Sequence, residues 1–279
     1  MSGRAVRVIA LIALAALVGS SGCRAAAQRV LRVCADPNNL PFSDRSGQGF
    51  ENRLAALLAS DRGARLEYTW WAQRRGFLRN TLSASRCDVV MGMPVHADRV
   101  RTTQPYYRSS YVFVSRAGSG LDIASLDDPR LRQLRVGVQL IGEDASNSPP
   151  AHALSGRGIV SNVVGYPVFG DYSKPSPLVP IVDAVEHRDV DIAIVWGPTA
   201  GYFARHRPVP LELRAVAPDA TFPALPFAFD IAMAVRPGDA GLAAELDDFI
   251  DRRRGDIERV LQDYGVPVIK DQGHAGVTE

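Results

Sequence analysis

From Gln28 onward, short runs of apolar residues alternate with stretches in which apolar residues recur at helical spacing. Runs of four to eight apolar or β-branched residues bounded by turn residues predict strands. The strands predicted in this way are residues 30–35, 66–70, 89–91, 111–114, 135–138, 159–163, 191–195 and 227–235. Most of them are separated by a helical stretch or a turn, so the order of elements already restricts the fold.

Apolar residues three and four positions apart predict the helices. Phe50, Leu54, Leu57 and Leu58 follow the turn at residues 47–49. Further helices are predicted at residues 77–83, at 179–187, from Gly197-Pro198 onward, at 242–250 and at 257–264. Alternating strands and helices predict parallel sheets with crossover helices, an α/β fold. The proline-rich residues 167–180 predict a long ordered loop, and residues 272–279 a flexible tail.

The N-terminal residues predict a secretory signal peptide, residues 1–27. Arg4 and Arg7 precede an apolar run that is too short to span a membrane comfortably, and small residues follow it. Two processing sites remain open. Cleavage before Gln28 is favoured, and a lipoprotein site at Cys23 is the alternative, as is a retained N-terminal anchor. Each of them places the protein outside the cytoplasm, in the periplasm.

Charge and composition exclude several classes of function. The chain of 279 residues has 46% hydrophobic and 22% charged residues, which excludes a disordered protein. The net charge of +2 becomes −1 without Arg4, Arg7 and Arg24. A balanced charge gives no electrostatic reason to expect a nucleic acid or an anionic membrane as partner.

The sequence contains no established catalytic motif. The nucleophile elbow, the zinc protease motif, the phosphate-binding loop and the dinucleotide fingerprint are all missing. Cys34 and Cys87 lack the spacing of a metal or thiol-redox site, and a disulfide between them suits an oxidising compartment. Histidines 96, 152, 187, 206 and 274 are scattered. Two α/β lobes without catalytic residues favour a binding protein with its ligand between the lobes, and no cofactor is expected.

Several segments resemble the type II periplasmic solute-binding proteins of the amino-acid class. They are residues 31–36, 40–42, 49–51, 88–92, 98–99, 105–107, 190–191, 198 and 202–203. The resemblance implies two α/β lobes joined by two crossover segments. It predicts lobe I from residues 28–114 plus 222–271, and lobe II from residues 117–220. In this fold the strands of Cys34 and Cys87 are neighbours, which agrees with a disulfide.

Longer strings look like the MoxJ/XoxJ group, periplasmic binding-protein homologues associated with PQQ-dependent methanol dehydrogenases. They are CADPNNLPFS, YTWWAQRRGFLRNTL, CDVVMGMPV, PYYRSSYVFVSR, VGVQLIGED, GYPVFGDYSKPSP and VDIAIVWGPTAGYFA. This resemblance implies a methanol dehydrogenase of the lanthanide or calcium type as partner, together with its cytochrome c.

The resemblance to amino-acid binders also assigns positions in the cleft. Arg99 stands where an arginine binds the ligand carboxylate. Pro94 replaces a hydroxyl donor, Trp196 replaces the acid that receives the ammonium group, and Arg74 replaces a covering aromatic residue. Asp36 is retained. An α-amino acid would therefore lose most of its partners, and a buried ammonium without a counter-charge is costly.

A large amphipathic cleft is expected instead, lined by residue types that dominate protein–protein hot spots. Its candidate residues are Asp36, Trp70, Trp71, Arg74, Arg75, Arg99, Gln139 and Trp196, with Tyr106 and Tyr107 beside them. The resemblance implies a non-enzymatic accessory protein that assists maturation or activation of the dehydrogenase. A transport receptor for a small metabolite is one alternative. An enzyme that uses Asp36 as acid or base is another.

Overall fold

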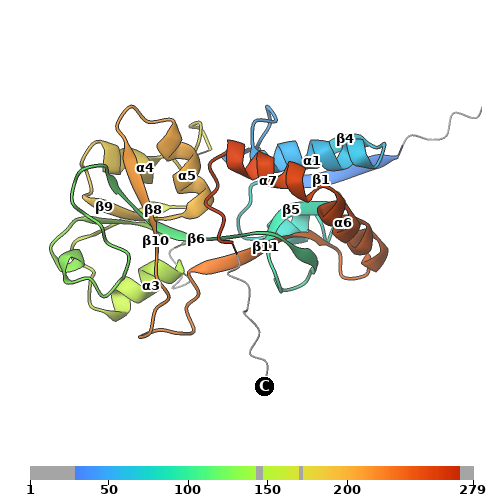
Figure 1. Cartoon of the computed structure of the whole chain (residues 1–279). Helices are drawn as coiled ribbons and strands as arrows, with labels where there is room; N and C mark the ends of the chain where they lie inside the picture. Colours follow the sequence, from blue (N-terminus) through green and yellow to red (C-terminus); the bar gives the residue numbers. More distant parts are fainter. Residues whose placement is uncertain (1–28, 143–146, 170–171, 271–279) are drawn as a thin grey trace, which may run out of the picture.

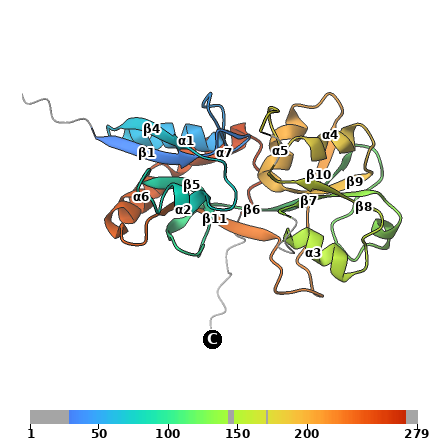
Figure 2. The same cartoon turned by 180° about the vertical axis from the view of Figure 1, so that it is seen from behind.

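The structure, a computed structural model, describes residues 29–142, 147–169 and 172–270. The predicted signal peptide with Cys23 and the predicted tail lie outside the described residues. Two α/β lobes lie side by side (Figure 1), and the same arrangement is seen from behind in Figure 2. No helix in the described ranges is long and apolar enough to cross a membrane.

Lobe I is built on a mixed parallel and antiparallel sheet with helices on both faces. Its strands are β1 (Val30–Ala35), β4 (Arg65–Trp70), β5 (Val89–Pro94), β11 (Ala228–Val235) and the first part of β6 (Arg101–Arg116). Its helices are α1 (Phe50–Asp61), α2 (Phe77–Asn80), α6 (Ala240–Arg252) and α7 (Arg254–Asp263). A small hairpin, β2 (Asn38–Asn39) and β3 (Ser43–Asp44), follows β1. The strand order is β4-β1-β5-β11-β6.

Lobe II repeats this architecture. Its strands are β7 (Val136–Leu140), β8 (Val163–Pro167), β9 (Ile192–Trp196), β10 (Leu211–Ala215) and the second part of β6. Its helices are α3 (Pro149–Gly156), α4 (Pro180–Glu186) and α5 (Gly197–Arg205), with a 3-10 turn at Pro129–Arg132. β7 pairs in parallel with β8 and β9, and β6 pairs with β9 and β10.

The strand β6 connects the two lobes because it is 16 residues long and changes partners midway. Up to Ser110 it pairs with β11 of lobe I, and from Tyr111 it pairs with β9 of lobe II. The second connection returns at Phe227, whose carbonyl accepts a hydrogen bond from the Tyr111 N–H at 2.8 Å. β6 and β11 lie between the lobes in Figure 1. The boundaries predicted at residues 114–117 and 220–222 stay predictions.

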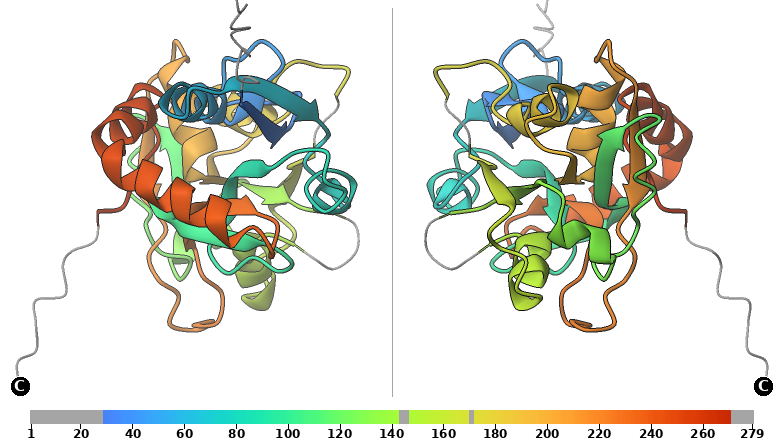
Figure 3. Two further views of the ribbon diagram at one scale, coloured as in Figure 1. Left: turned by 90° about the vertical axis from the view of Figure 1, so that its right-hand side faces the viewer. Right: turned by 90° about the vertical axis from the view of Figure 1, so that its left-hand side faces the viewer.

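Alternating strand residues face separate hydrophobic cores. In lobe I, Val33 and Met91 pack with α1, α6 and α7, whereas Cys34 and Val90 face α2 on the opposite side. In lobe II, Ile192 and Ile194 face one core and Ala193 and Val195 the other. Helices of lobe I surround its strands when the molecule is viewed from that end (Figure 3). The near-continuous apolar strands of the sequence are therefore strands buried on both faces.

Most of the predicted strands and helices are confirmed, and the differences have local causes. The strand predicted at residues 159–163 is wrong. Ile159 is buried because the chain turns back at the end of α3, where the Ile159 N–H donates to the Leu154 carbonyl at 3.0 Å. The strand β8 begins only at Val163. The first half of β6, β10 and α3 were not expected, because polar residues interrupt their apolar spacing.

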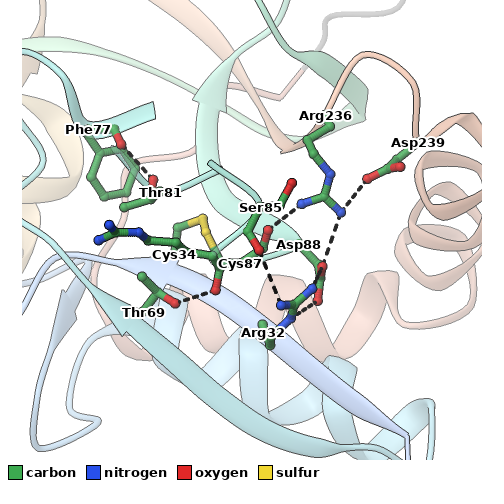
Figure 4. Close-up of a disulfide and its surroundings, with 11 residues drawn as sticks. Arg32, Cys34, Thr69, Phe77, Thr81, Ser85, Cys87, Asp88, Arg236 and Asp239 are labelled. Atoms are coloured by element: carbon green, nitrogen blue, oxygen red, sulfur yellow. Dashed lines mark hydrogen bonds and ion pairs between the residues drawn. A yellow bond between two sulfur atoms is a disulfide. The ribbon is translucent and has the colours of Figure 1, made fainter. Parts of the chain in front are cut away.

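Cys34 and Cys87 form a disulfide bond, with their Cα atoms 5.4 Å apart, as predicted. Cys34 pairs with Val90 in the β1–β5 ladder, and Cys87 lies three residues before it. Both side chains are buried against α2 (Figure 4). Arg236 stabilises the backbone at Cys87 and Asp88. Its guanidinium donates to the Cys87 carbonyl at 2.6 Å and to the Asp88 carboxylate at 3.2 Å.

Candidate functional site

A cavity of about 430 Å³ lies between the two lobes. Its walls come from the carboxyl ends of strands in both lobes, where ligands of open α/β sheets bind. The residues that line it are Asn39, Phe42, Glu51, Gln73, Gly92, Pro94, Tyr107, Tyr111, Gln139, Ile141, Pro149, Val168, Phe169, Leu178, Trp196, Thr199, Phe229 and Ile231. Its volume is within the range of small-molecule and side-chain pockets.

Aromatic rings form one wall of the cavity. Trp196, the last residue of β9, packs edge-to-face between Tyr111 and Phe229, with ring centroids 5.4 Å and 5.8 Å apart. The backbone N–H of Trp196 donates to the Gln139 side-chain oxygen at 2.8 Å, which fixes this corner. Burial raises the pKa of Tyr111 to about 12, so its phenol stays neutral. The wall presents ring faces and edges rather than charges.

Glu51 is the only carboxylic acid among the described residues that line the cavity. It lies in the first turn of α1, and its backbone N–H donates to the Phe42 carbonyl at 2.9 Å. The side chain is 9% exposed. Burial, with a smaller contribution from the negative charge of Asp36, raises the pKa of Glu51 from 4.5 to about 8. Glu51 is therefore mostly a neutral acid at pH 7.

Gly92 of β5 leaves the space that the Glu51 carboxyl group occupies. A Cβ atom at position 92 would lie 2.2 Å from Glu51 Oε1. A side chain here would displace the carboxyl group, so this glycine is needed for close approach rather than for backbone freedom.

Residues 172–176, which we call the closing loop, extend from lobe II and contact lobe I. The Tyr172 hydroxyl donates to Asp36 Oδ2. The Asn38 side chain donates to the Lys174 carbonyl at 2.8 Å and accepts from the Ser176 N–H at 3.2 Å. The Arg74 guanidinium lies 5.5 Å from the centre of the Tyr172 ring. These contacts join the two lobes.

Replacing Tyr172 by phenylalanine should open the cleft. The hydroxyl group makes a hydrogen bond to a charged acceptor, and such bonds contribute about 1.5–3 kcal/mol. Its loss should shift the equilibrium between closed and open lobes by roughly ten- to a hundredfold. Hydrogen exchange at the backbone amides of Gln73 and Asn38, which also donate to Asp36, should accelerate accordingly.

Tyr166→Phe is the matched control, because Tyr166 lies on β8 within lobe II. That variant should exchange like the wild-type protein. Equal exchange rates in all three proteins would show that the closing loop does not hold the lobes together.

Three of the candidate residues from the sequence lie at or next to the cavity. Gln139 and Trp196 line it. Asp36 is buried at the end of β1, and its carboxylate accepts from the Asn38 N–H at 2.8 Å, the Gln73 N–H at 2.6 Å and the Tyr172 hydroxyl. Of these three donors only the Tyr172 hydroxyl comes from lobe II, so this hydrogen bond links Asp36 to the other lobe. A role as acid or base would require Asp36 to exchange those partners.

The other candidates lie on lobe I and are not among the described residues that line the cavity. Trp70 stacks on Tyr68 at 4.5 Å, and Trp71 is 38% exposed with Arg86 over its ring. Arg74, Arg75 and Arg99 are exposed. Arg99 has a positive φ of 66° in the turn after β5. A role of the eight candidates in partner binding stays a prediction.

Tyr106 and Tyr107 differ in position, because adjacent residues on β6 point in different directions. The Tyr106 hydroxyl donates to the Met91 carbonyl at 2.9 Å in the core of lobe I. Tyr107 is also buried but reaches the cavity. Burial raises the pKa of both phenols well above the usual value.

Glu51 and Tyr172 are two of the site residues that were not predicted from the sequence. Glu51 follows Gly49-Phe50, and an acid in the first turn of a helix ordinarily interacts with the helix dipole at the surface. Its neighbours Phe50, Leu54 and Leu58 are fully buried, which was the available signal. Tyr172 lies in the proline-rich loop, whose path across the lobes has no local signature.

The described residues contain no group of three or more His, Cys, Asp or Glu side chains that could hold a metal ion. The cavity combines apolar and aromatic walls with one buried acid and the amide groups of Asn39, Gln73 and Gln139. This arrangement is suited to enclosing an apolar group that carries one polar function.

Comparison with known proteins gives consistent results. The chain is 33% identical to Protein MoxJ of Methylorubrum extorquens over 247 residues, 86% of this chain and 81% of the relative. The crystal structure of the periplasmic binding protein XoxJ from Methylobacterium extorquens AM1 has a TM-score of 0.71 at 34% identity, covering 87% of this chain and 100% of that one.

The crystal structure of MxaJ from Methlophaga aminisulfidivorans MPT has a TM-score of 0.73 at 28% identity, over 86% of this chain and 100% of that one. No family model matches the chain. These likenesses confirm the predicted α/β fold of a type II periplasmic binding protein.

Proposed function

The chain belongs to the MoxJ family of periplasmic binding proteins, and from this premise we propose that it is a non-enzymatic accessory protein of a PQQ-dependent methanol dehydrogenase. In this proposal the two lobes enclose a segment of the dehydrogenase and thereby assist its maturation or activation. The partner is a dehydrogenase of the calcium or lanthanide type, acting with its cytochrome c. The protein works in the periplasm after export by its N-terminal signal sequence.

The chemistry of the cavity walls carries this proposal. Of the described residues that line the cavity, none is lysine or arginine. The carboxylate of an α-amino acid would therefore be buried without a counter-charge, at a cost of several kcal/mol. Pro94 and Trp196 line the cavity at the positions where amino-acid binders have a hydroxyl donor and an acid. This environment opposes a zwitterion and favours apolar side chains.

The aromatic lining of the cavity is better suited to a protein segment than to a free metabolite. Tryptophan and tyrosine, which line the cavity as Trp196, Tyr107 and Tyr111, are enriched at the centres of protein interfaces. The closing loop is held by a few polar contacts, so the lobes can separate about β6 and β11 to admit a segment. Hinge motion of this kind is the usual way in which two-lobed proteins enclose ligands.

Truncating Trp196 should weaken binding of the dehydrogenase. The indole packs between Tyr111 and Phe229 at the centre of the wall, and truncation of such a residue costs about 2 kcal/mol or more, roughly thirtyfold in affinity. The experiment titrates purified PQQ-dependent methanol dehydrogenase against wild-type protein and Trp196→Ala, by calorimetry or fluorescence anisotropy. Circular dichroism establishes that the variant is folded.

Val160→Ala is the control, because it truncates an apolar side chain that is 60% exposed, lies outside the cavity lining and is not among the candidate partner-binding residues. It should bind the dehydrogenase like the wild-type protein. If Val160→Ala weakened binding and Trp196→Ala did not, the partner surface would lie on the outside of lobe II. If neither protein bound the dehydrogenase but a small solute bound tightly with closure of the lobes, the protein would be a transport receptor.

A further inference from the structure

The Glu51 carboxyl group faces the cavity without a hydrogen-bond partner in the described parts of the chain. Only two causes shift its pKa, burial and the charge of Asp36, and neither a hydrogen bond nor a cation contributes. Buried carboxyl groups are ordinarily paired or hydrogen-bonded. An acid that is nine-tenths buried and aimed into a cavity therefore points to a group that the occupant supplies.

We propose that Glu51 is the recognition group for a cation, namely a lysine or arginine side chain that an apolar segment of the dehydrogenase inserts into the cavity. This inference rests on the proposed function and specifies the occupant. The carboxylate and the cation would neutralise each other inside the cavity. The aromatic rings of Tyr107, Tyr111 and Trp196 would receive the rest of the side chain, and ring faces also attract cations.

The surroundings of Glu51 favour a cation over a neutral partner. Asp36 at the end of β1 is the second acid close enough to affect it, and both acids favour a positive guest. The remaining titratable groups that sense the Glu51 charge are the phenols of Tyr68 on β4 and of Tyr106 and Tyr107 on β6. Burial raises the pKa of each phenol, so all three stay neutral and supply no competing counter-charge.

Binding should release a proton. Without an occupant Glu51 holds its proton up to about pH 8, whereas a bound cation stabilises the carboxylate and lowers its pKa. The affinity for a cation should therefore rise about tenfold per pH unit between pH 6 and 7.5 and become constant above pH 8. A neutral guest that accepts a hydrogen bond from the protonated acid would show the opposite dependence.

The first test uses 2-phenylethylamine and 2-phenylethanol as probes, which differ in a single charged group. Calorimetry measures their affinity and the protons released for wild-type protein, Glu51→Gln and Gly92→Ala. The glutamine variant keeps the shape but cannot ionise. The alanine variant keeps the acid but displaces it, because its Cβ would lie 2.2 Å from Oε1. Glu186→Gln is the matched control, since Glu186 is a buried acid on α4 in lobe II.

We expect wild-type protein and Glu186→Gln to prefer the amine by tenfold or more at pH 7.5, with release of about one proton at pH 7. Glu51→Gln and Gly92→Ala should lose both the preference and the proton release. Equal binding of amine and alcohol by the wild-type protein, or an affinity for the amine that falls as the pH rises, would overturn the inference.

The second test repeats the titration with purified dehydrogenase at pH 6 and 7.5. Glu51→Gln should bind at least tenfold more weakly than wild-type protein at pH 7.5, and its affinity should not depend on pH through this group. Equal binding by both proteins would overturn the inference and leave the proposed function intact. No binding of the dehydrogenase, with the amine preference retained, would contradict the proposed function and identify Glu51 as a site for a free amine.

Discussion

Glu51→Gln should make the protein more stable than the wild type at pH 8 and leave its stability unchanged at pH 4.5. The pKa of Glu51 is about 8 in the folded protein, compared with 4.5 for the ordinary side chain. Between these two values the unfolded chain loses a proton that the folded protein keeps. The stability of the wild-type protein therefore falls as the pH rises through this window.

The size of the effect follows from the same two pKa values. A difference of about 3.5 units corresponds, at pH 8, to a loss of up to about 4 kcal/mol in the free energy of unfolding. Glutamine has no proton to release, so the variant lacks this loss. The side chain is 9% exposed, and solvent screening therefore reduces the effect only slightly.

Urea unfolding, followed by tryptophan fluorescence at pH 4.5, 6, 7 and 8, measures this difference directly. Glu186→Gln serves again as the control, because it replaces a buried acid that does not line the cavity. If the free energy of unfolding depended on pH in the same way in wild-type protein and Glu51→Gln, the predicted stabilisation at pH 8 would be contradicted. Such a result would mean that Glu51 ionises near pH 4.5 in the folded protein.

Removing the disulfide bond should lower the free energy of unfolding by about as much as the ionisation of Glu51 does at pH 8. The bond joins residues 53 positions apart, and closing a loop of this length stabilises a protein by roughly 4 kcal/mol in the chain-entropy model. Both sulfur atoms are buried against α2, so the double variant Cys34→Ala/Cys87→Ala also leaves a small cavity. The melting temperature should fall by roughly 10 °C for a chain of this size.

Thermal melting with and without a reducing agent measures the contribution of the bond. Reductant should lower the melting temperature of the wild-type protein toward that of the double variant, and should not affect the variant itself. A double variant that melts within about 2 °C of the oxidised wild-type protein would show that the bond contributes little. Two reactive thiols in denatured, unreduced periplasmic protein would show that the bond does not form.

The sequence by itself determined most of the elements and the class of the fold. The strand β5 is an uninterrupted apolar run, β1 is interrupted only by Arg32, β4 alternates polar and apolar residues, and α1 has apolar residues at helical spacing. Such patterns can be read from the sequence alone, because side chains point to one face at a fixed spacing along a strand or a helix. The strings around Trp70 and Trp196 similarly carried the family resemblance, since they are unusual and long. The pairing of Cys34 with Cys87 followed from their being the two cysteines beyond the predicted signal peptide.

Only the tertiary structure decided which residues meet in the cleft. Arg99 stands at the position of a carboxylate-binding residue but lies in an exposed turn, whereas Glu51 is enclosed by Phe42, Gly92 and Tyr107. Likewise, Tyr172 joins Asp36 across 136 positions of the chain. Burial and the distance between two lobes depend on how separate elements pack, and no residue encodes them alone. A carboxyl group in the first turn of a helix is ordinarily exposed to water, but that of Glu51 is buried between packed elements, and its pKa is therefore raised.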